Sequence, residues 1–275
     1  MILVTGASGT LGTPVTRLLA EAGADVHGLS RRAREPAAGV TWHKGDLWKG
    51  EGIDAALEGV ETIVHCASDP FHTKRDLAAT RRLVEAARGQ GAPHLIYISI
   101  VGVDTIPYSY YRTKHAVERL IEDSGLPYTI LRTTQFHTLP DMVFAVLTKI
   151  PGVVALPRNL RDQPIDVGEV AERLTELALA AGPARRVEDM GGPEVLTAEE
   201  MMRDYLAARG LRKPVRLPLP LPGKAARGFR EGRHLTPDRA VGEADLEAVP
   251  GRDPHASVTG GFPSRIGLIR PRHVP

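Results

Sequence analysis

The sequence predicts an α/β fold of the doubly wound type, in which helices cover both faces of a mostly parallel sheet, with a smaller C-terminal lobe. Short apolar runs that suit buried strands alternate with longer amphipathic stretches that suit helices. A glycine-rich turn separates the first apolar run from the first amphipathic stretch. The length of 275 residues is sufficient for such a sheet and one further lobe.

Composition excludes several classes of protein. The 35 Lys and Arg residues nearly balance the 33 Asp and Glu residues, so the charge gives no reason to expect direct binding of nucleic acid or of an anionic membrane. The single cysteine, Cys66, excludes an internal disulfide. The sequence has neither a signal-peptide pattern nor a run of about 18 apolar residues. We therefore expect a cytoplasmic protein that binds a small molecule, and the sequence does not indicate an oligomeric state.

The N-terminal segment, residues 2–12, reads Ile-Leu-Val-Thr-Gly-Ala-Ser-Gly-Thr-Leu-Gly and precedes an amphipathic helix predicted over residues 11–22. Gly6 lets the chain reverse, Gly9 lets a pyrophosphate approach the backbone, and Gly12 lets the helix pack closely on the strand. Free amide groups at the start of the helix would face the phosphates. The segment therefore predicts a dinucleotide-binding turn; the alternative is a purely structural strand–helix turn.

The spacing Gly-x-x-Gly-x-x-Gly after Thr5 resembles the extended and atypical short-chain dehydrogenases/reductases, over roughly residues 1–180. The resemblance implies an NAD(P)-binding Rossmann domain over residues 1–150. It implies a return helix and a smaller substrate-facing lobe over residues 151–241. Residues 242–275 are then an atypical tail. The turn residues that it assigns to the cofactor, besides the three glycines, are Ser8, Thr10 and Leu11.

The end of the second predicted strand, residues 25–29, indicates which dinucleotide binds. NAD-binding members carry an acidic residue about 20 positions after the glycines, where it binds the ribose 2′-hydroxyl. This chain has Ser30, Arg31 and Arg32 at that point, and planar guanidinium groups suit a phosphate. We therefore expect NADP(H) as the cofactor. The alternative is that these arginines, with Arg34, form a solvated loop.

Two further strand ends match the family. The strand predicted over residues 40–44 leads to a Gly-Asp-Leu sequence in which the family's aspartate binds the adenine amino group, here Asp46 beside Leu47. Asp46 equally fits a helix N-cap. The strand over residues 62–66 leads to Ala67 and Ser68, where related proteins let the cofactor ribose pass.

Cys66, at the end of the same strand, is expected to be a small buried hydrophobe rather than a reactive thiol. A long helix is predicted over residues 73–89. The histidines at positions 65, 72, 137 and 234 have no spacing that suggests a metal site.

Candidate catalytic residues follow the fifth predicted strand, residues 94–99. Tyr110 and Lys114 lie four apart, on one face of a helix, as in the Tyr-x-x-x-Lys pair of the family. The lysine is expected to lower the pKa of the phenol and to hold the nicotinamide ribose, and the tyrosine to exchange a proton. Ser99 is assigned to the cofactor, whereas the family's catalytic serine position is occupied by Ile100.

The sequence from residue 98 to 104, followed by Tyr-Tyr-Arg-x-Lys, looks like the NmrA-like branch, which includes quinone and dye reductases and redox-sensing regulators without turnover. After a sixth strand over residues 126–131, the family lays a loop over the nicotinamide. In this chain that loop supplies Thr133, Gln135 and Phe136.

An apolar helix over residues 136–150 either lines a substrate pocket or forms ordinary core. Two more helices are predicted over residues 169–180 and 197–209, the second opened by a capping box of Thr197 and Glu200.

Three functions remain open from the sequence: an NADPH-dependent reductase of a small apolar acceptor, a non-catalytic dinucleotide sensor, and a redox-neutral isomerase, dehydratase or cyclase. Residues 242–275 lack a periodic apolar face and are rich in Pro, Gly and Arg. We predict that this tail is poorly ordered, carries no site residue and arises from a frameshift.

Overall fold

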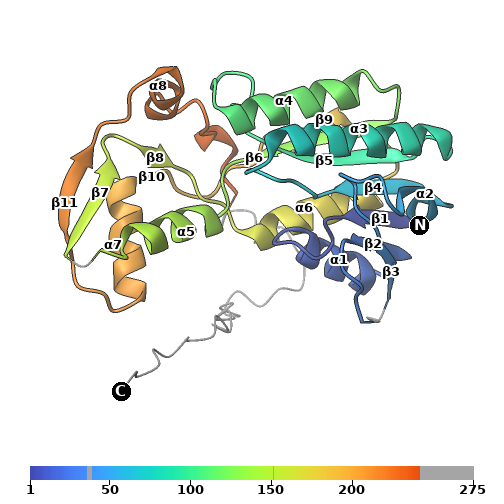
Figure 1. Cartoon of the computed structure of the whole chain (residues 1–275), viewed down its shortest axis with the longest axis horizontal. Helices are drawn as coiled ribbons and strands as arrows, with labels where there is room; N and C mark the ends of the chain where they lie inside the picture. Colours follow the sequence, from blue (N-terminus) through green and yellow to red (C-terminus); the bar gives the residue numbers. More distant parts are fainter. Residues whose placement is uncertain (36–38, 151, 242–275) are drawn as a thin grey trace. The chain divides into compact units, whose positions relative to one another are not determined.

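The computed structural model describes residues 1–35, 39–150 and 152–241. Within these residues, seven parallel strands form a central sheet in the order β3-β2-β1-β4-β5-β6-β9 (Figure 1). This order confirms the doubly wound α/β prediction. Successive strands are added on one side of β1 as far as β3, and then on its other side from β4 onward, so the switch point lies between β1 and β4. The strands are β1 (Ile2–Thr5), β2 (Val26–Ser30), β3 (Val40–Lys44), β4 (Thr62–His65), β5 (His94–Ile100), β6 (Tyr128–Thr133) and β9 (Arg185–Arg186).

Helices cover the sheet in two groups, each with its own apolar core. Leu3 and Val4, adjacent in β1, belong to different core clusters because successive side chains of a strand point to opposite faces. Burial on both faces explains why the strands read as continuous apolar runs. Val4 packs with α1 (Gly12–Glu21) and α6 (Val167–Leu179), and Leu3 packs with α2 (Ile53–Leu57), α3 (Thr73–Gly89) and α4 (Ser109–Glu122).

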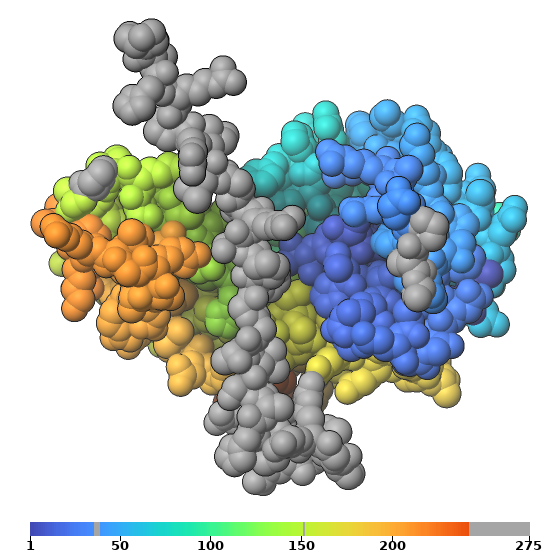
Figure 2. Space-filling model, turned by 90° about the horizontal axis from the view of Figure 1, so that it is seen from below, coloured from blue at the N-terminus to red at the C-terminus, as the bar shows by residue number. Residues whose placement is uncertain are grey.

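A smaller lobe has a third core, in which the rings of Phe144 and Tyr205 meet edge to face at 5.6 Å. It contains a parallel strand pair, β7 with β11, and an antiparallel pair, β8 with β10. Figure 2 shows it in lime and orange. Its elements are α5 (Thr138–Leu147), β7 (Val153–Pro157), β8 (Arg161–Asp162), β10 (Leu196–Thr197), α7 (Ala198–Ala208), β11 (Val215–Leu219), α8 (Lys224–Arg230) and the short 3-10 helix η1 (Pro237–Arg239).

Most predicted elements are found within two residues of their expected ends, and the capping box of α7 is present. The apolar helix predicted over residues 136–150 is shorter, and Phe144 is the only residue of α5 that is fully buried. Met142 and Val146 are 50% and 57% exposed, so the ordinary-core interpretation of this helix is wrong. Thr138, its first residue, lines the cleft described below.

The predicted domain boundary at residue 150 does not mark the end of the sheet domain. After residue 150, β9 is still a strand of the central sheet, and α6 still covers one of its faces. The division into two domains stays a prediction. The tail over residues 242–275 lies outside the described residues. None of the described helices combines the length and the apolar character needed to cross a membrane.

A buried ion pair joins α4 to the end of β6. Arg132 donates from Nε and Nη2 to the two carboxylate oxygens of Glu118, at 2.8 and 2.6 Å. Its Nη1 also donates to Asp104 at 2.9 Å. The side chains of Arg132 and Glu118 are 5% and 4% exposed. The pair fixes the backbone immediately before the Thr133–Phe136 loop.

Replacing Glu118 with alanine should lower the free energy of unfolding by about 3 kcal/mol, because it leaves a buried guanidinium with only one carboxylate. Urea denaturation measures the change. The matched control is Glu122→Ala on the same helix, whose exposed pair with Arg119 should contribute less than about 1 kcal/mol. Equal losses in the two variants would contradict the importance of the buried pair.

Candidate functional site

A cleft of about 1080 Å³ runs along the carboxyl ends of the central strands. This is the edge at which open α/β sheets bind ligands. The cleft brings together the predicted site residues Gly6, Ser8, Gly9, Thr10, Leu11, Ser30, Arg31, Asp46, Leu47, Ala67, Ser68, Ser99, Tyr110, Lys114, Thr133, Gln135 and Phe136. Two predicted residues are not part of its lining, Gly12 and Arg32. Gly12 is buried beneath the turn, and Arg32 is exposed beside Arg31.

The glycine turn has no room for side chains at two of its three glycines. Gly6 has a φ of +65°, and a Cβ there would lie 2.7 Å from the backbone nitrogen of Ala67. A Cβ on Gly12 would collide with the carbonyl oxygen of Gly6. The turn is closed by the amide of Gly9, which donates to the Gly6 carbonyl at 2.8 Å. The strand–helix packing expected of Gly12 is therefore present.

The residues present fit a dinucleotide. The N-cap position of α1, Leu11, supplies no side-chain hydrogen bond. The amide of Thr13 donates to the Gly9 carbonyl at 3.0 Å, so the amides of Thr10 and Leu11 are the ones that we assign to an anion. Across the cleft, the hydroxyl of Ser99 is buried and has no hydrogen-bond partner within the described residues. A buried polar atom of this kind is expected to meet a ligand or water.

At the end of β2, Arg31 and Arg32 are exposed, and the amide of Arg32 donates to the hydroxyl of Ser30 at 3.3 Å. Arg34 lies 5.9 Å from the ring centroid of Trp42. Arg31 lines the cleft and Arg32 follows it in the chain, whereas Arg34 packs against Trp42. The binding of a 2′-phosphate by Arg31 and Arg32 stays a prediction.

Asp46 organises the turn after β3. Its Oδ1 accepts hydrogen bonds from the amides of Trp48 and Lys49, at 2.8 and 3.3 Å. No helix starts at this point, so the N-cap alternative is wrong and the carboxylate instead caps a turn. Contact of Asp46 with adenine stays a prediction.

A chain of hydrogen bonds crosses the other end of the cleft. The phenol oxygen of Tyr110 lies 2.8 Å from the hydroxyl of Ser68, and that hydroxyl lies 3.1 Å from Oδ2 of Asp76. The amide of Asp69 donates to Oδ1 of Asp76 at 3.2 Å. Asp76 is 6% exposed, and burial raises the pKa of its carboxyl against the opposing effect of Lys114.

Asp76 was not among the residues predicted from the sequence to form the site. A signal existed, because Asp76 shares the buried face of α3 with Thr80, Leu83, Val84 and Ala87. A carboxylate on the apolar face of a helix is rare unless it has partners.

Lys114 does not act on Tyr110 as the sequence suggested. Its ammonium group donates to the carbonyl of Ile98 at 2.8 Å and lies 4.3 Å from the ring centroid of Tyr97. Burial lowers the pKa of Lys114 to about 8. Burial also raises the pKa of Tyr110 to about 12. The expectation that the lysine lowers the pKa of the phenol is therefore wrong, and Tyr110 is a neutral phenol at physiological pH.

Two other groups at the end of β4 are also neutral. His65 is held between the hydroxyls of Thr5 and Thr80, at 2.6 and 3.0 Å, and burial lowers its pKa to about 3. Burial raises the pKa of the Cys66 thiol to about 12. Across residues 1–35, 39–150 and 152–241, no group of His, Cys, Asp and Glu is arranged to hold a metal ion.

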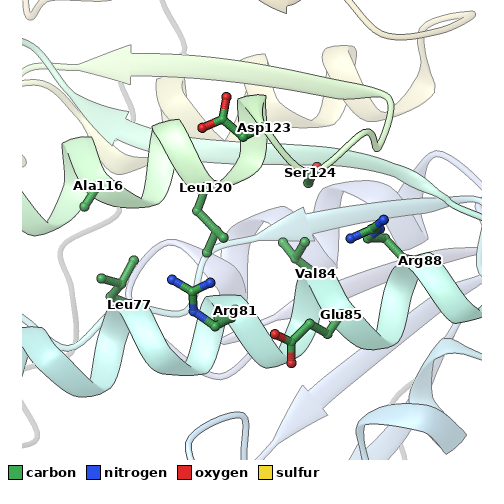
Figure 3. A pocket seen from close by; sticks show the side chains of 9 residues that line it. All are labelled: Leu77, Arg81, Val84, Glu85, Arg88, Ala116, Leu120, Asp123 and Ser124. Atoms are coloured by element: carbon green, nitrogen blue, oxygen red, sulfur yellow. The ribbon is translucent and has the colours of Figure 1, made fainter.

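A second, smaller cavity of about 480 Å³ lies between α3 and α4. Figure 3 shows Leu77 and Val84 of α3 opposite Ala116 and Leu120 of α4, with charged side chains at its borders. It contains none of the predicted site residues, and we therefore assign the ligand site to the larger cleft.

Comparison with known proteins decides the family. Residues 6–172 match the model of a family described as NAD(P)H-binding. The chain belongs to this NAD(P)H-binding family. Membership of the NmrA-like branch of the atypical short-chain dehydrogenases/reductases is consistent with the match.

Several relatives are reductases by name. The chain is 31% identical over 222 residues to a (4-alkanoyl-5-oxo-2,5-dihydrofuran-3-yl)methyl phosphate reductase of Streptomyces griseus, a match that covers 78% of this chain and 76% of the relative. It is 28% identical over 223 residues to an NAD(P)H azoreductase of Xenophilus azovorans, with the same two coverages of 78% and 76%.

The fold is shared with the NADPH complex of the quinone oxidoreductase QOR2 of Escherichia coli. The TM-score is 0.73 at 20% identity, and the match covers 86% of this chain and 92% of that one. The family and the fold together establish an NAD(P)H-binding Rossmann domain in this chain.

The reactivity of the Cys66 thiol tests whether its environment in the cleft raises its pKa. With its pKa raised to about 12, it should react with iodoacetamide at pH 8 at least about a hundredfold more slowly in the native protein than in urea. Mass spectrometry of the labelled protein measures the rate, and the single cysteine removes ambiguity. Equal rates in the two states would contradict the raised pKa of this thiol.

Proposed function

We propose that the protein is an NADPH-dependent reductase of a small apolar acceptor, such as a quinone, an enone or a polyketide-like carbonyl compound. The observation that carries the proposal is the lining of the cleft beyond β5, which includes Tyr110 together with the apolar Ile100 and Phe136. A polar hydroxyl and apolar side chains in one lining suit a small, mostly apolar acceptor with a reactive oxygen. The names of the Streptomyces and Xenophilus relatives support the same class of reaction.

In this proposal the cofactor supplies the hydride, and the chain positions both reactants. The amides of Thr10 and Leu11 hold the pyrophosphate at the start of α1, and Arg31 and Arg32 hold the 2′-phosphate. We assign the nicotinamide ribose to Ser99, whose hydroxyl has no hydrogen-bond partner within the described residues, and to Lys114, both of which line the cleft.

The Thr133–Phe136 segment covers the nicotinamide. Its position is fixed by Gln135, whose side-chain amide donates to the phenol oxygen of Tyr111 at 3.0 Å, and by the Arg132 ion pair before it. Tyr110 is the proton donor to the reduced acceptor.

A second candidate function is a dinucleotide-sensing regulator without turnover. The observation that favours it is the position of Ile100, whose backbone pairs with Thr133 at the end of β5, where catalytic members of the family carry a serine. The direction of Lys114 toward the Ile98 carbonyl also favours it. This candidate requires tight binding of the cofactor and no hydride transfer.

NADPH oxidation at 340 nm, followed with a panel of quinones, enones and simple ketones, separates the two candidates. Turnover with at least one apolar acceptor is the result that the reductase proposal expects. Tight NADPH binding without turnover on any acceptor would reject the reductase and leave the sensor.

Replacing both Arg31 and Arg32 with alanine should weaken NADPH binding about tenfold or more, because each charge-assisted contact contributes roughly 1.5–3 kcal/mol. Fluorescence titration of each cofactor measures the effect, and the affinity for NADH should stay nearly unchanged. The matched control is Arg34→Ala, whose guanidinium lies against Trp42. An NADPH affinity that survives loss of both arginines would show that this loop does not contact the phosphate.

Replacing Tyr110 with phenylalanine should lower kcat about 10²- to 10⁴-fold with an acceptor that requires a proton, while NADPH binding stays intact. Steady-state kinetics with an enone measure the change. Tyr108→Phe, two residues earlier and 48% exposed, is the control and should leave kcat unchanged. If Tyr110→Phe behaves like that control, Tyr110 has no part in the reaction.

A further inference from the structure

Asp76, Ser68 and Tyr110 form a chain of hydrogen bonds. The hydroxyls of Ser68 and Tyr110 carry one proton each, so each can donate only one hydrogen bond, and this limits the directions in which the bonds can run. With Asp76 ionised, its carboxylate accepts the only proton of the Ser68 hydroxyl. Ser68 can then only accept from Tyr110, so the phenol proton points toward Ser68 and not toward a ligand. In this state Tyr110 can accept a hydrogen bond from a ligand but cannot donate one.

Protonation of Asp76 reverses every bond of the chain. The amide of Asp69 occupies Oδ1 of Asp76, so a proton on the carboxyl is directed from Oδ2 toward Ser68. Ser68 then donates to Tyr110, and the phenol proton becomes free to point into the cleft. The three groups therefore have two arrangements, which differ in whether the site offers a donor or an acceptor.

We propose that Asp76 is a positioning residue whose protonation state, passed through Ser68, sets the direction of the Tyr110 hydroxyl and so decides whether the site can donate a proton to a bound acceptor. Lys114, the partner expected from the Tyr-x-x-x-Lys pattern, is bonded to the Ile98 carbonyl instead. The phenol reaches the buried carboxyl of Asp76 through one hydroxyl, that of Ser68.

The chemical consequence rests on the proposed reductase function, whereas the orientation of the phenol does not. During reduction of a carbonyl group, the hydride forms a bond to carbon and the π electron pair moves to oxygen. That oxygen takes the phenol proton, Tyr110 takes the proton of Ser68, and Ser68 takes the proton of Asp76. Solvent then reprotonates Asp76, so one NADPH and one proton are consumed for each acceptor.

Several charged or titratable groups face Asp76. Lys114 and Tyr110 belong to α4, Tyr97 to β5, and Asp69 to the segment after β4. Although burial opposes it, hydrogen bonds from His72 hold the pKa of Asp69 below its usual value. Asp69 therefore titrates at lower pH than Asp76, and the two carboxyls are distinguishable.

The experiment follows the phenol directly, without turnover or ligand. The full chain is labelled with ¹³Cζ-tyrosine, its six tyrosines are resolved by NMR, and the Tyr110→Phe variant assigns the signal. In the wild type the Tyr110 signal should shift in a single titration with a midpoint above about 3.9, the ordinary pKa of Asp. The signal of Tyr111, whose phenol bonds to Gln135, is the internal control.

Two variants complete the test. In Asp76→Asn, the Asp69 amide should keep the side-chain oxygen in place and direct the NH₂ group toward Ser68, so the Tyr110 signal should stay at the low-pH limit of the wild type at every pH. Ser68→Ala should remove the titration from Tyr110 by breaking the chain. The proposal would be overturned by a Tyr110 signal that does not titrate in the wild type, or by one that titrates in both variants as it does in the wild type. Either result counts whether or not the protein reduces any acceptor.

Discussion

The close packing of α1 on β1 is the constraint on which the rest of the structure depends. Gly12 lies against the Gly6 carbonyl, and Gly6 lies against the backbone at Ala67, so neither position tolerates a Cβ. These two contacts bring the start of α1 and the ends of β1 and β4 together. The helix amides therefore face the cleft, and the segment that carries Ser68 lies beside the turn.

At the other end of the cleft, the properties of the site depend on buried polar groups and not on glycines. His65, Cys66 and Tyr110 are all neutral through physiological pH because burial disfavours their charged forms. Lys114 and Asp76 are the groups of this cleft whose pKa values burial moves toward neutrality, in opposite directions. The chemistry proposed for this end thus uses neutral hydroxyls whose direction depends on a distant carboxyl.

The fold was predictable because its signals are local. The glycine spacing, the continuous apolar strands and the helix over residues 73–89 each follow from the neighbouring sequence, and all are present. Half of the cleft lining was predictable for the same reason, since the ends of parallel strands meet at one edge. The shortened α5 was less predictable, because an apolar stripe alone does not reveal whether another element covers it.

The partners of Lys114 and Asp76 could not be predicted from spacing. Residues four apart on a helix share a face, but the direction of a long side chain depends on the groups across from it. In this chain the Ile98 carbonyl and the Tyr97 ring, both from β5, attract the ammonium of Lys114. Asp76 and Tyr110 are 34 positions apart, and the Ser68 hydroxyl can link them because α3 and α4 pack side by side over the sheet.

The most direct test of the account is a crystal structure of the protein with NADPH bound. We predict that the pyrophosphate lies on the amides at the start of α1, the 2′-phosphate beside Arg31, and the nicotinamide between the Thr133–Phe136 segment and Tyr110. A dinucleotide bound in the reverse direction, or outside the cleft at the carboxyl ends of the strands, would contradict the account.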